Sequence, residues 1–424
     1  MSDSPSNLPE GQLRASANWT EEGRAATGAN DGQAAAEEMP REDAVVDPIV
    51  DVPAESVIRS EPLTPVSEEA PLFESFTRPL PPPPPARIPH LGHLLLVAAL
   101  ALMGLAVSIA FYVGGVHFHL FGVTSLQQAG NDIHYILGTE AIIYLFTFGI
   151  SLWVFPEVWH KSLFAGLQWN GATARHLTGR LVGAAFICFV LAFVNGELMP
   201  GPENTPIEKV FRTPGAAWLL FAFGVTMAPF FEEMFFRGFL LPAVATASDW
   251  IAEKINSDAE IMMSPSGRPL WPFPANAVAA FTLLSLPTSV FLARYWKESH
   301  FAIWVFLLYA AGLLTLILLL ATSETHMRER ARPIDENGEP LWSISSMIVA
   351  SVFTSLPFAA MHAEQTGYSI GPFLLLVGVS LVLCGVRLST RSLAASVVVH
   401  ACYNFLLFSL MLIGTGGFRH LDRM

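Results

Sequence analysis

Long apolar runs recur along this chain from Gly92 onward, and they limit the folds it can adopt more than any other feature. A helix crosses the bilayer core with about 20 apolar residues and a barrel strand with only about 10, so runs of about 18 to 25 residues indicate helices. Hydrophobic residues make up 52% of the sequence and charged residues only 14%, which argues against several soluble domains. We therefore predict an all-α, polytopic transmembrane helical bundle of eight or nine spans, near residues 92–114, 138–156, 181–199, 216–246, 276–295, 301–321, 343–362, 370–387 and 392–414.

The first 88 residues differ from the rest in composition, because they are rich in Glu, Ala, Pro and Ser. Such a segment cannot bury enough apolar surface to order itself. Residues 1–90 hold 16 of the 36 acidic side chains and 6 of the 23 basic ones, so the net charge of −13 belongs mostly to this segment. We predict a disordered, acidic, Pro-rich tail over 1–88 and a transmembrane domain over 89–424, with no basic footprint for nucleic acid.

The Lys and Arg residues between the runs predict the orientation in the membrane. With the N-terminus in the cytoplasm, twelve of them fall in the inside segments and six in the outside segments. Cytoplasmic loops carry the excess of basic residues in membrane proteins. We therefore expect an integral membrane protein whose N-terminus is cytoplasmic.

Two adjacent glutamates and an arginine stand inside the fourth apolar run. Charged groups at bilayer depth cost several kcal/mol each, so they are rarely accidental. In a helix Glu233 and Arg237 are four residues apart and share a face, so we expect them to pair as structural support. Glu232 points roughly 100° away from that pair and is left for the chemistry. The run is long enough to bend, at Pro229 or Gly238.

Two further apolar runs contain histidines. Phe358 and His362 are four residues apart, as are His400 and Asn404, so each pair shares a helix face. A carboxylate in apolar surroundings, such as Glu232, is a competent base for water, and His362 could share that water or pass its proton to the departing amine. His400 and Asn404 could donate hydrogen bonds to the oxyanion of a peptide carbonyl. No serine or cysteine has the partners of an activated nucleophile, so direct attack by water is the simpler route.

These three motifs, in this order and each in an apolar segment, resemble those of the CAAX protease and bacteriocin-processing family, which includes the type II CAAX prenyl endopeptidases. The resemblance covers roughly residues 180–414. The resemblance implies that the catalytic residues are Glu232, His362, His400 and Asn404, and that the supporting residues are Glu233, Arg237 and Phe358. It also implies an all-helical bundle around a conical cavity, with no obligatory metal or other cofactor. The expected partners are a peptide or protein substrate, lipidated substrates included, and membrane lipid, in a bacterial inner membrane.

The spacing of the motifs departs from that family. Its second-motif histidine usually follows the glutamates by a few tens of residues, whereas about 125 residues intervene here. We interpret residues 248–342, approximately, as an inserted helix pair, which preserves the sidedness of the later spans. The predicted seventh span puts His362 near its outer end, while Glu232 and His400 lie deeper. We therefore expect this span to continue toward Tyr368 or to start later than drawn.

Three other functions remain open on the residues alone. Buried acid–histidine sets also serve proton-coupled transporters and channels. Glu232, His362 and His400 could instead be three ligands of a catalytic zinc ion with an open fourth position, although no His-Glu-x-x-His spacing favours it. The chain could also be an inactive membrane scaffold that keeps the family's fold.

Overall fold

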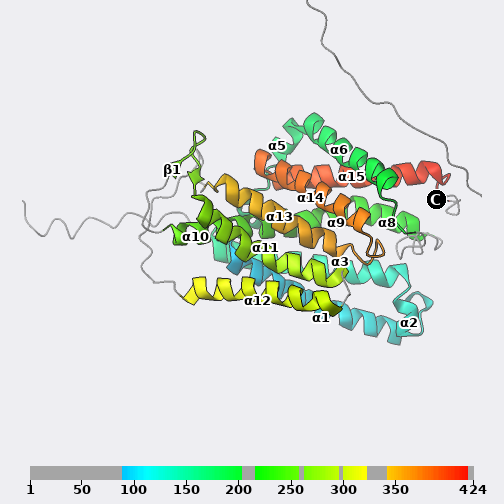
Figure 1. Cartoon of the computed structure of the whole chain (residues 1–424). Helices are drawn as coiled ribbons and strands as arrows, with labels where there is room; N and C mark the ends of the chain where they lie inside the picture. The colour runs from blue at the N-terminus through cyan, green and yellow to red at the C-terminus, as the bar shows by residue number, and fades with distance from the viewer. Residues whose placement is uncertain (1–87, 203–214, 257–261, 296–298, 322–340, 419–424) are drawn as a thin grey trace, which may run out of the picture. The chain divides into compact units, whose positions relative to one another are not determined.

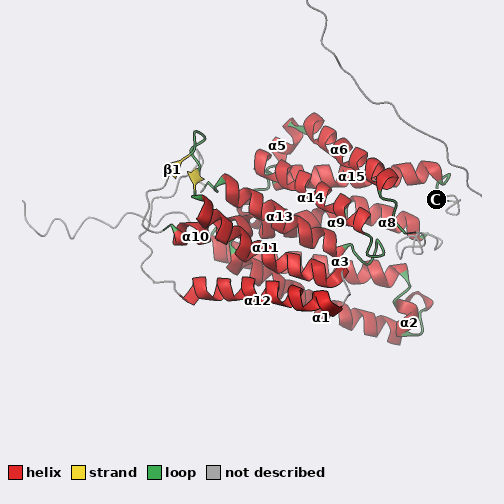
Figure 2. Cartoon of the chain, viewed as in Figure 1, coloured by secondary structure: helices red, strands yellow, loops and turns green. Residues whose placement is uncertain are grey.

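The computed structural model describes residues 88–202, 215–256, 262–295, 299–321 and 341–418. The predicted tail lies outside these residues except for its last position. Within them the chain is helical apart from its turns and one small antiparallel ribbon of two strands (Figure 2). The elements, in chain order (Figure 1), are α1 (Leu91–His117), η2 (Leu120–Gly122), α2 (Leu126–Ala129), α3 (Ile133–Trp159), α4 (Leu163–Gly166), α5 (Gly171–His176), α6 (Thr178–Leu198), α8 (Ala216–Val225), α9 (Met227–Glu233), η3 (Met234–Leu240), α10 (Leu241–Ile255), β1 (Met262–Met263), β2 (Pro269–Leu270), α11 (Phe273–Tyr295), α12 (Ser299–Ala321), α13 (Ile344–Met361), α14 (Ile370–Thr390) and α15 (Leu393–Gly414).

The helices that could cross a membrane match the predicted runs. In the described ranges, nine helical spans are long and apolar enough for a crossing. Each of them overlaps one of the nine predicted runs, and the all-α transmembrane bundle is confirmed. The fourth span covers Ala216–Ile255 and consists of α8, α9, η3 and α10 in succession.

The fourth span is irregular at two places, both near residues where a bend was predicted. Pro229 has no N–H for the carbonyl of Val225, four residues earlier. The helix breaks beside that carbonyl at Thr226 (φ −115°, ψ −73°), whose hydroxyl donates to the Ala222 carbonyl at 2.6 Å. Further on, η3 is a π-helical stretch that contains Gly238, and such stretches are frequent at functional sites.

The fourth span is packed on several sides by other helices. α9 packs on α15, α10 packs on α13 and α11, and η3 contacts α1, α13, α14 and α15. Residues 231–245 are buried apart from Phe235. Any polar side chain in this stretch must therefore find its partners within the protein.

The start of α13 is anchored to α10 by a buried carboxylate. Ser343 is the N-cap of α13, and its hydroxyl accepts from the Ser346 backbone N–H at 3.1 Å. The Ser346 hydroxyl donates to Asp249 Oδ1 at 2.7 Å. The two helices are antiparallel, so the residue twelve positions after Ser346 lies opposite the residue twelve positions before Asp249. These residues are Phe358 and Arg237, and the guanidinium carbon lies 4.5 Å from the centroid of the phenyl ring. This register fixes which residues of the two spans lie at one level.

The beginning of α15 is held by the turn that precedes it. Ser392 caps the helix by accepting from the Ala395 N–H at 3.2 Å, and its hydroxyl donates to the Asn170 carbonyl at 2.7 Å. Arg387, near the end of α14, donates to Gln168 Oε1 at 2.9 Å. The ninth span therefore starts at a position fixed by the segment between the second and third spans.

The predicted inserted pair corresponds to α11 and α12. α11 packs on α10 and α13, and α12 packs mainly on α11. Gly312 of α12 lies so close to Ser285 of α11 that a Cβ there would collide with the serine side chain. α12 is the least buried of the spans. That these helices are an insertion stays a prediction.

Candidate functional site

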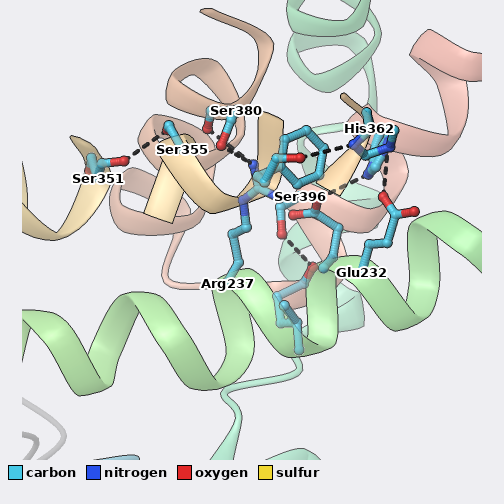
Figure 3. A network of polar contacts seen from close by, with 11 residues as sticks. Glu232, Arg237, Ser351, Ser355, His362, Ser380 and Ser396 are labelled. Atoms are coloured by element: carbon cyan, nitrogen blue, oxygen red, sulfur yellow. Dashed lines mark hydrogen bonds and ion pairs between the residues drawn. The ribbon is translucent and has the colours of Figure 1, made fainter. Parts of the chain in front are cut away.

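Glu233 and Arg237 form a fully buried ion pair at the junction of α9 and η3. Arg237 Nη1 donates to Glu233 Oε1 at 2.7 Å, and both side chains are 0% exposed. Arg237 Nη2 donates to the hydroxyl of Ser380 on α14 at 2.8 Å and to its carbonyl at 3.2 Å. Figure 3 shows Arg237 reaching toward Ser380, while Glu232 projects from the same helix toward the end of the cluster where His362 lies. The predicted pairing is present, and α14 holds the arginine in place.

His400 of α15 stands between the two glutamates. Its Nδ1 is 3.0 Å from Glu233 Oε1, and its Nε2 is 3.8 Å from Glu232 Oε2. A carboxylate paired with an arginine only accepts hydrogen bonds, so the proton of this contact belongs to His400 Nδ1. In the neutral ring Nε2 then presents a lone pair to Glu232, which would repel an ionised carboxylate. Glu232 and His400 are therefore stable together when they share one proton, on the carboxyl or on the ring.

The two glutamates differ in accessibility. Glu233 is 0% exposed, whereas Glu232 is 8% exposed. Arg237 and His400 both contact Glu233, while among the described residues the ion-pair partner of Glu232 is the more distant Nε2 of His400. Glu232 is therefore the carboxylate of the two that can meet a water molecule.

His362 follows the last residue of α13, one turn beyond Phe358. Its Nδ1 is 2.9 Å from the Phe358 carbonyl, which can only accept, so Nδ1–H donates and the neutral ring keeps a lone pair on Nε2. The ring centroids of His362 and Phe358 are 5.2 Å apart, and those of Phe358 and His400 are 5.8 Å apart. Both histidines therefore lie against one phenyl ring.

The level of His362 corrects one expectation. α13 begins and ends within one residue of the predicted bounds, so the expected displacement toward Tyr368 is wrong. The error lay in assuming that every span crosses the bilayer end to end. The fourth span is about 60 Å long at 1.5 Å per residue, twice the bilayer core. Ser346 faces Asp249. His362 is sixteen residues after Ser346 and Glu233 is sixteen residues before Asp249, so this antiparallel register places His362 and Glu233 at one level.

Asn404 contacts the fourth span one turn along α15 from His400. Its Nδ2 donates to the Gly224 carbonyl at 2.7 Å, next to the break at Thr226. The shared face of the third motif is thus directed at the fourth span, His400 at α9 and Asn404 at α8. An oxyanion role for Asn404 would use its second amide N–H, and that role stays a prediction.

The structure adds a carboxylate that the sequence reasoning missed. Glu140 of α3 accepts a hydrogen bond from Tyr144 Oη at 2.8 Å. It lies close enough to Glu232 and His362 to interact electrostatically with both. The ring of Tyr144 stacks on Phe231, with centroids 4.9 Å apart. The signal that could have found Glu140 is its place inside the second apolar run, where a carboxylate is costly.

The donor geometry bears on the zinc alternative. Over the described ranges, no group of three or more His, Cys, Asp or Glu side chains is arranged to hold a metal ion. Both ring nitrogens of His400 face glutamates, and Nδ1 of His362 is bonded to a backbone carbonyl. This arrangement suits proton transfer better than a three-ligand metal centre.

Comparison with known proteins gives one match. The family model for type II CAAX prenyl endopeptidase Rce1-like proteins matches residues 214–406, a segment that contains all seven predicted site residues. No curated protein and no solved structure matches the chain. The nine apolar spans and this family together describe an integral membrane protein. Over residues 214–406, a little under half of the chain, the sequence is similar to the Rce1-like family of type II CAAX prenyl endopeptidases.

Proposed function

We propose that this chain is an intramembrane endopeptidase in which Glu232 activates a water molecule to hydrolyse a peptide bond. The observation that supports this most is that the two adjacent glutamates have different partners and different exposure. Glu233 is neutralised by Arg237 and fixed by His400, whereas Glu232 keeps some exposure and has His400 at 3.8 Å. A buried carboxylate that keeps a small exposed fraction, in a polar cluster, is suited to general-base catalysis.

The reaction follows from the proton positions. Water attacks the carbonyl carbon, forming a C–O bond, while Glu232 takes one proton of that water. His362, whose Nε2 lone pair is unoccupied in the neutral ring, relays this proton to the amide nitrogen. The C–N bond then breaks, giving a carboxylic acid and an amine. Histidine and carboxylate groups in such roles contribute about 10²–10⁴-fold each to rate.

The oxyanion formed by this attack needs hydrogen-bond donors. His400 donates from Nδ1 to Glu233, so it can donate from Nε2 only as an imidazolium. The proton shared by Glu232 and His400 therefore links the two roles: while it is on the ring, Glu232 is a base and His400 is a donor. Asn404 can add its second N–H, and Phe358 holds the two histidine rings apart.

The family suggests the substrate and the setting. We propose a CAAX-type peptide or protein substrate, lipidated or not, that reaches the site from membrane lipid, and hydrolysis without a cofactor. The excess of Lys and Arg on one side supports a cytoplasmic N-terminus, in a bacterial inner membrane.

Cleavage by the purified full chain in liposomes tests this proposal. Quenched-fluorescent peptides ending in a CAAX sequence, farnesylated and unmodified, are compared for wild type, Glu232→Gln and the control Glu364→Gln, which alters an exposed carboxylate beyond His362. We expect Glu232→Gln to lose about 10²-fold or more in rate and Glu364→Gln to match wild type.

Three outcomes would contradict the proposal. Cleavage by Glu232→Gln at the wild-type rate would remove the carboxylate from the mechanism. Loss of wild-type activity on adding a chelator, with recovery on adding zinc, would favour the metal alternative. Proton flux into liposomes without cleavage of any peptide would favour a transporter.

A further inference from the structure

Glu140 lies outside the segment that matches the family, on the second membrane span. Its span is apolar, and it is neither at an end of the helix nor fully exposed. A carboxylate at this depth is expensive unless it is paired or has a task. We therefore expect Glu140 to have a partner or a function within the bundle.

Tyr144 directs Glu140 toward the fourth span. The tyrosine is one turn from Glu140, and its hydroxyl donates to Glu140 Oε1 at 2.8 Å. Its ring is stacked on Phe231, at 4.9 Å and 25°, and on Phe223, at 6.2 Å and 12°. Phe231 immediately precedes Glu232. Tyr144 therefore binds the Glu140 carboxylate and also contacts the segment that holds Glu232, the proposed base.

The charges in the cluster do not balance without the histidines. Glu140, Glu232 and Glu233 are three carboxylates, and Arg237 neutralises Glu233. The remaining two carboxylates have two histidines near them: His400 stands against Glu232, and Glu140 is within electrostatic reach of His362. In surroundings of low dielectric, each carboxylate favours a proton on its neighbouring imidazole.

We propose that Glu140 is a positioning residue of this active site, with its carboxylate, held by Tyr144, serving as the counter-ion of the His362 imidazolium that forms during proton transfer. The inference rests on the proposed peptidase function. It assigns to the second span a part in the chemistry, acting through His362 and touching neither water nor substrate.

The protonation of His362 depends on its burial, on one backbone hydrogen bond and on two nearby charges. Burial disfavours the imidazolium most and Arg237 on η3 also disfavours it, whereas the Phe358 carbonyl on α13 and the Glu140 carboxylate on α3 favour it. Arg237 is already engaged by Glu233, so Glu140 is the one carboxylate here with no basic residue bonded to it in the described ranges. Removing its charge makes His362 harder to protonate and proton relay slower.

Glu140→Gln tests the inference, because it removes the charge and keeps an oxygen that can accept from Tyr144. The control is Glu157→Gln, which alters an exposed carboxylate on the same helix. We expect Glu140→Gln to lower kcat about tenfold, as for the loss of one nearby opposite charge, with KM little changed. The acid limb of its pH–activity profile should move to lower pH, whereas Glu157→Gln should show neither effect. Glu140→Asp should recover part of the rate.

A double-mutant cycle separates this role from a structural one. In a His362→Gln background, Glu140→Gln should cause no further loss, because the charge has nothing left to act through. An equal loss in both backgrounds, or a wild-type kcat and pH profile for Glu140→Gln, would overturn the inference. Thermal unfolding of each variant in detergent shows whether the fold is kept, and a destabilised Glu140→Gln would be replaced by Tyr144→Phe, which frees the carboxylate from its donor. If Glu232→Gln still cleaves at the wild-type rate, the proposed function fails. If Glu232→Gln is inactive but Glu140→Gln keeps the wild-type kcat and pH profile, this inference alone fails.

Discussion

Replacing Arg237 by methionine is expected to leave Glu233 as an uncompensated carboxylate in the centre of the bundle. The guanidinium donates at 2.7 Å to Glu233 and at 2.8 Å to the Ser380 hydroxyl, and both members of the ion pair are 0% exposed. No solvent can take over these bonds. Breaking a buried ion pair by removing one partner costs about 3–5 kcal/mol, so we expect a loss of this size for Arg237→Met.

The double variant Glu233→Gln/Arg237→Met should lose much less than Arg237→Met, because it removes both charges while the glutamine oxygen can still accept from His400. The measurement is thermal unfolding of the purified chain in detergent. At about 2–4 °C per kcal/mol, the scale for domains of 150–250 residues, the single variant should unfold about 6 °C or more below wild type. Arg180→Met, at an exposed arginine of α6, is the control. An unchanged Tm for Arg237→Met, or a double variant whose Tm is as low as that of Arg237→Met or lower, would refute this reasoning.

Two further predictions concern the periphery of the bundle. Gly312→Val in α12 should push this helix away from Ser285 of α11 and lower stability by about 1–3 kcal/mol, measurable as a fall in Tm, whereas valine at the open position Gly378 should not collide. The α1 cap should be sensitive to acid: His90 Nδ1 accepts from the Gly92 N–H at 3.1 Å, and partial burial lowers the pKa of His90. Because the folded state favours the neutral ring, the cap is complete above the ordinary value near 6.5 and is lost as the pH falls below it. Amide exchange protection of residues 91–94 should drop from pH 7.5 to 5, and should not do so in His90→Asn, whose cap does not titrate.

The sequence predicted the spans well because length and hydropathy alone identify them. The largest displacement is at the end of the fourth span, which was predicted as 216–246 and is found as Ala216–Ile255, because polar residues of α10 such as Asp249 and Glu253 are helical without being apolar. Helix periodicity also predicted the contact between Glu233 and Arg237, since it is local to one helix. What periodicity cannot predict is which residue of another span stands at the same level.

The unpredicted parts of the site are therefore the contacts between spans. Ser380 on Arg237 and Gly224 under Asn404 depend on helix register, and no motif spacing encodes that register. The level of His362 was misjudged because every span was assumed to cross the bilayer from end to end, so that a position within a span was taken as a depth in the membrane. Glu140 was not predicted because it is a single carboxylate in an otherwise ordinary apolar run, and no motif of several residues marks it.

The π-helical stretch η3 has a consequence for how the fourth span serves two neighbours. One additional residue in a helical turn rotates everything beyond it by about 100° relative to a continuous α-helix. α9 can consequently present its side chains to α15 while α10 presents its own to α13. Shortening this stretch by a residue would realign the two halves, so one of the contacts would be aimed at lipid. The seven residues Met234–Leu240 thus set the rotation of α10 relative to α9. Any chimera that joins the two halves of this span from different chains must therefore keep all seven residues from one parent.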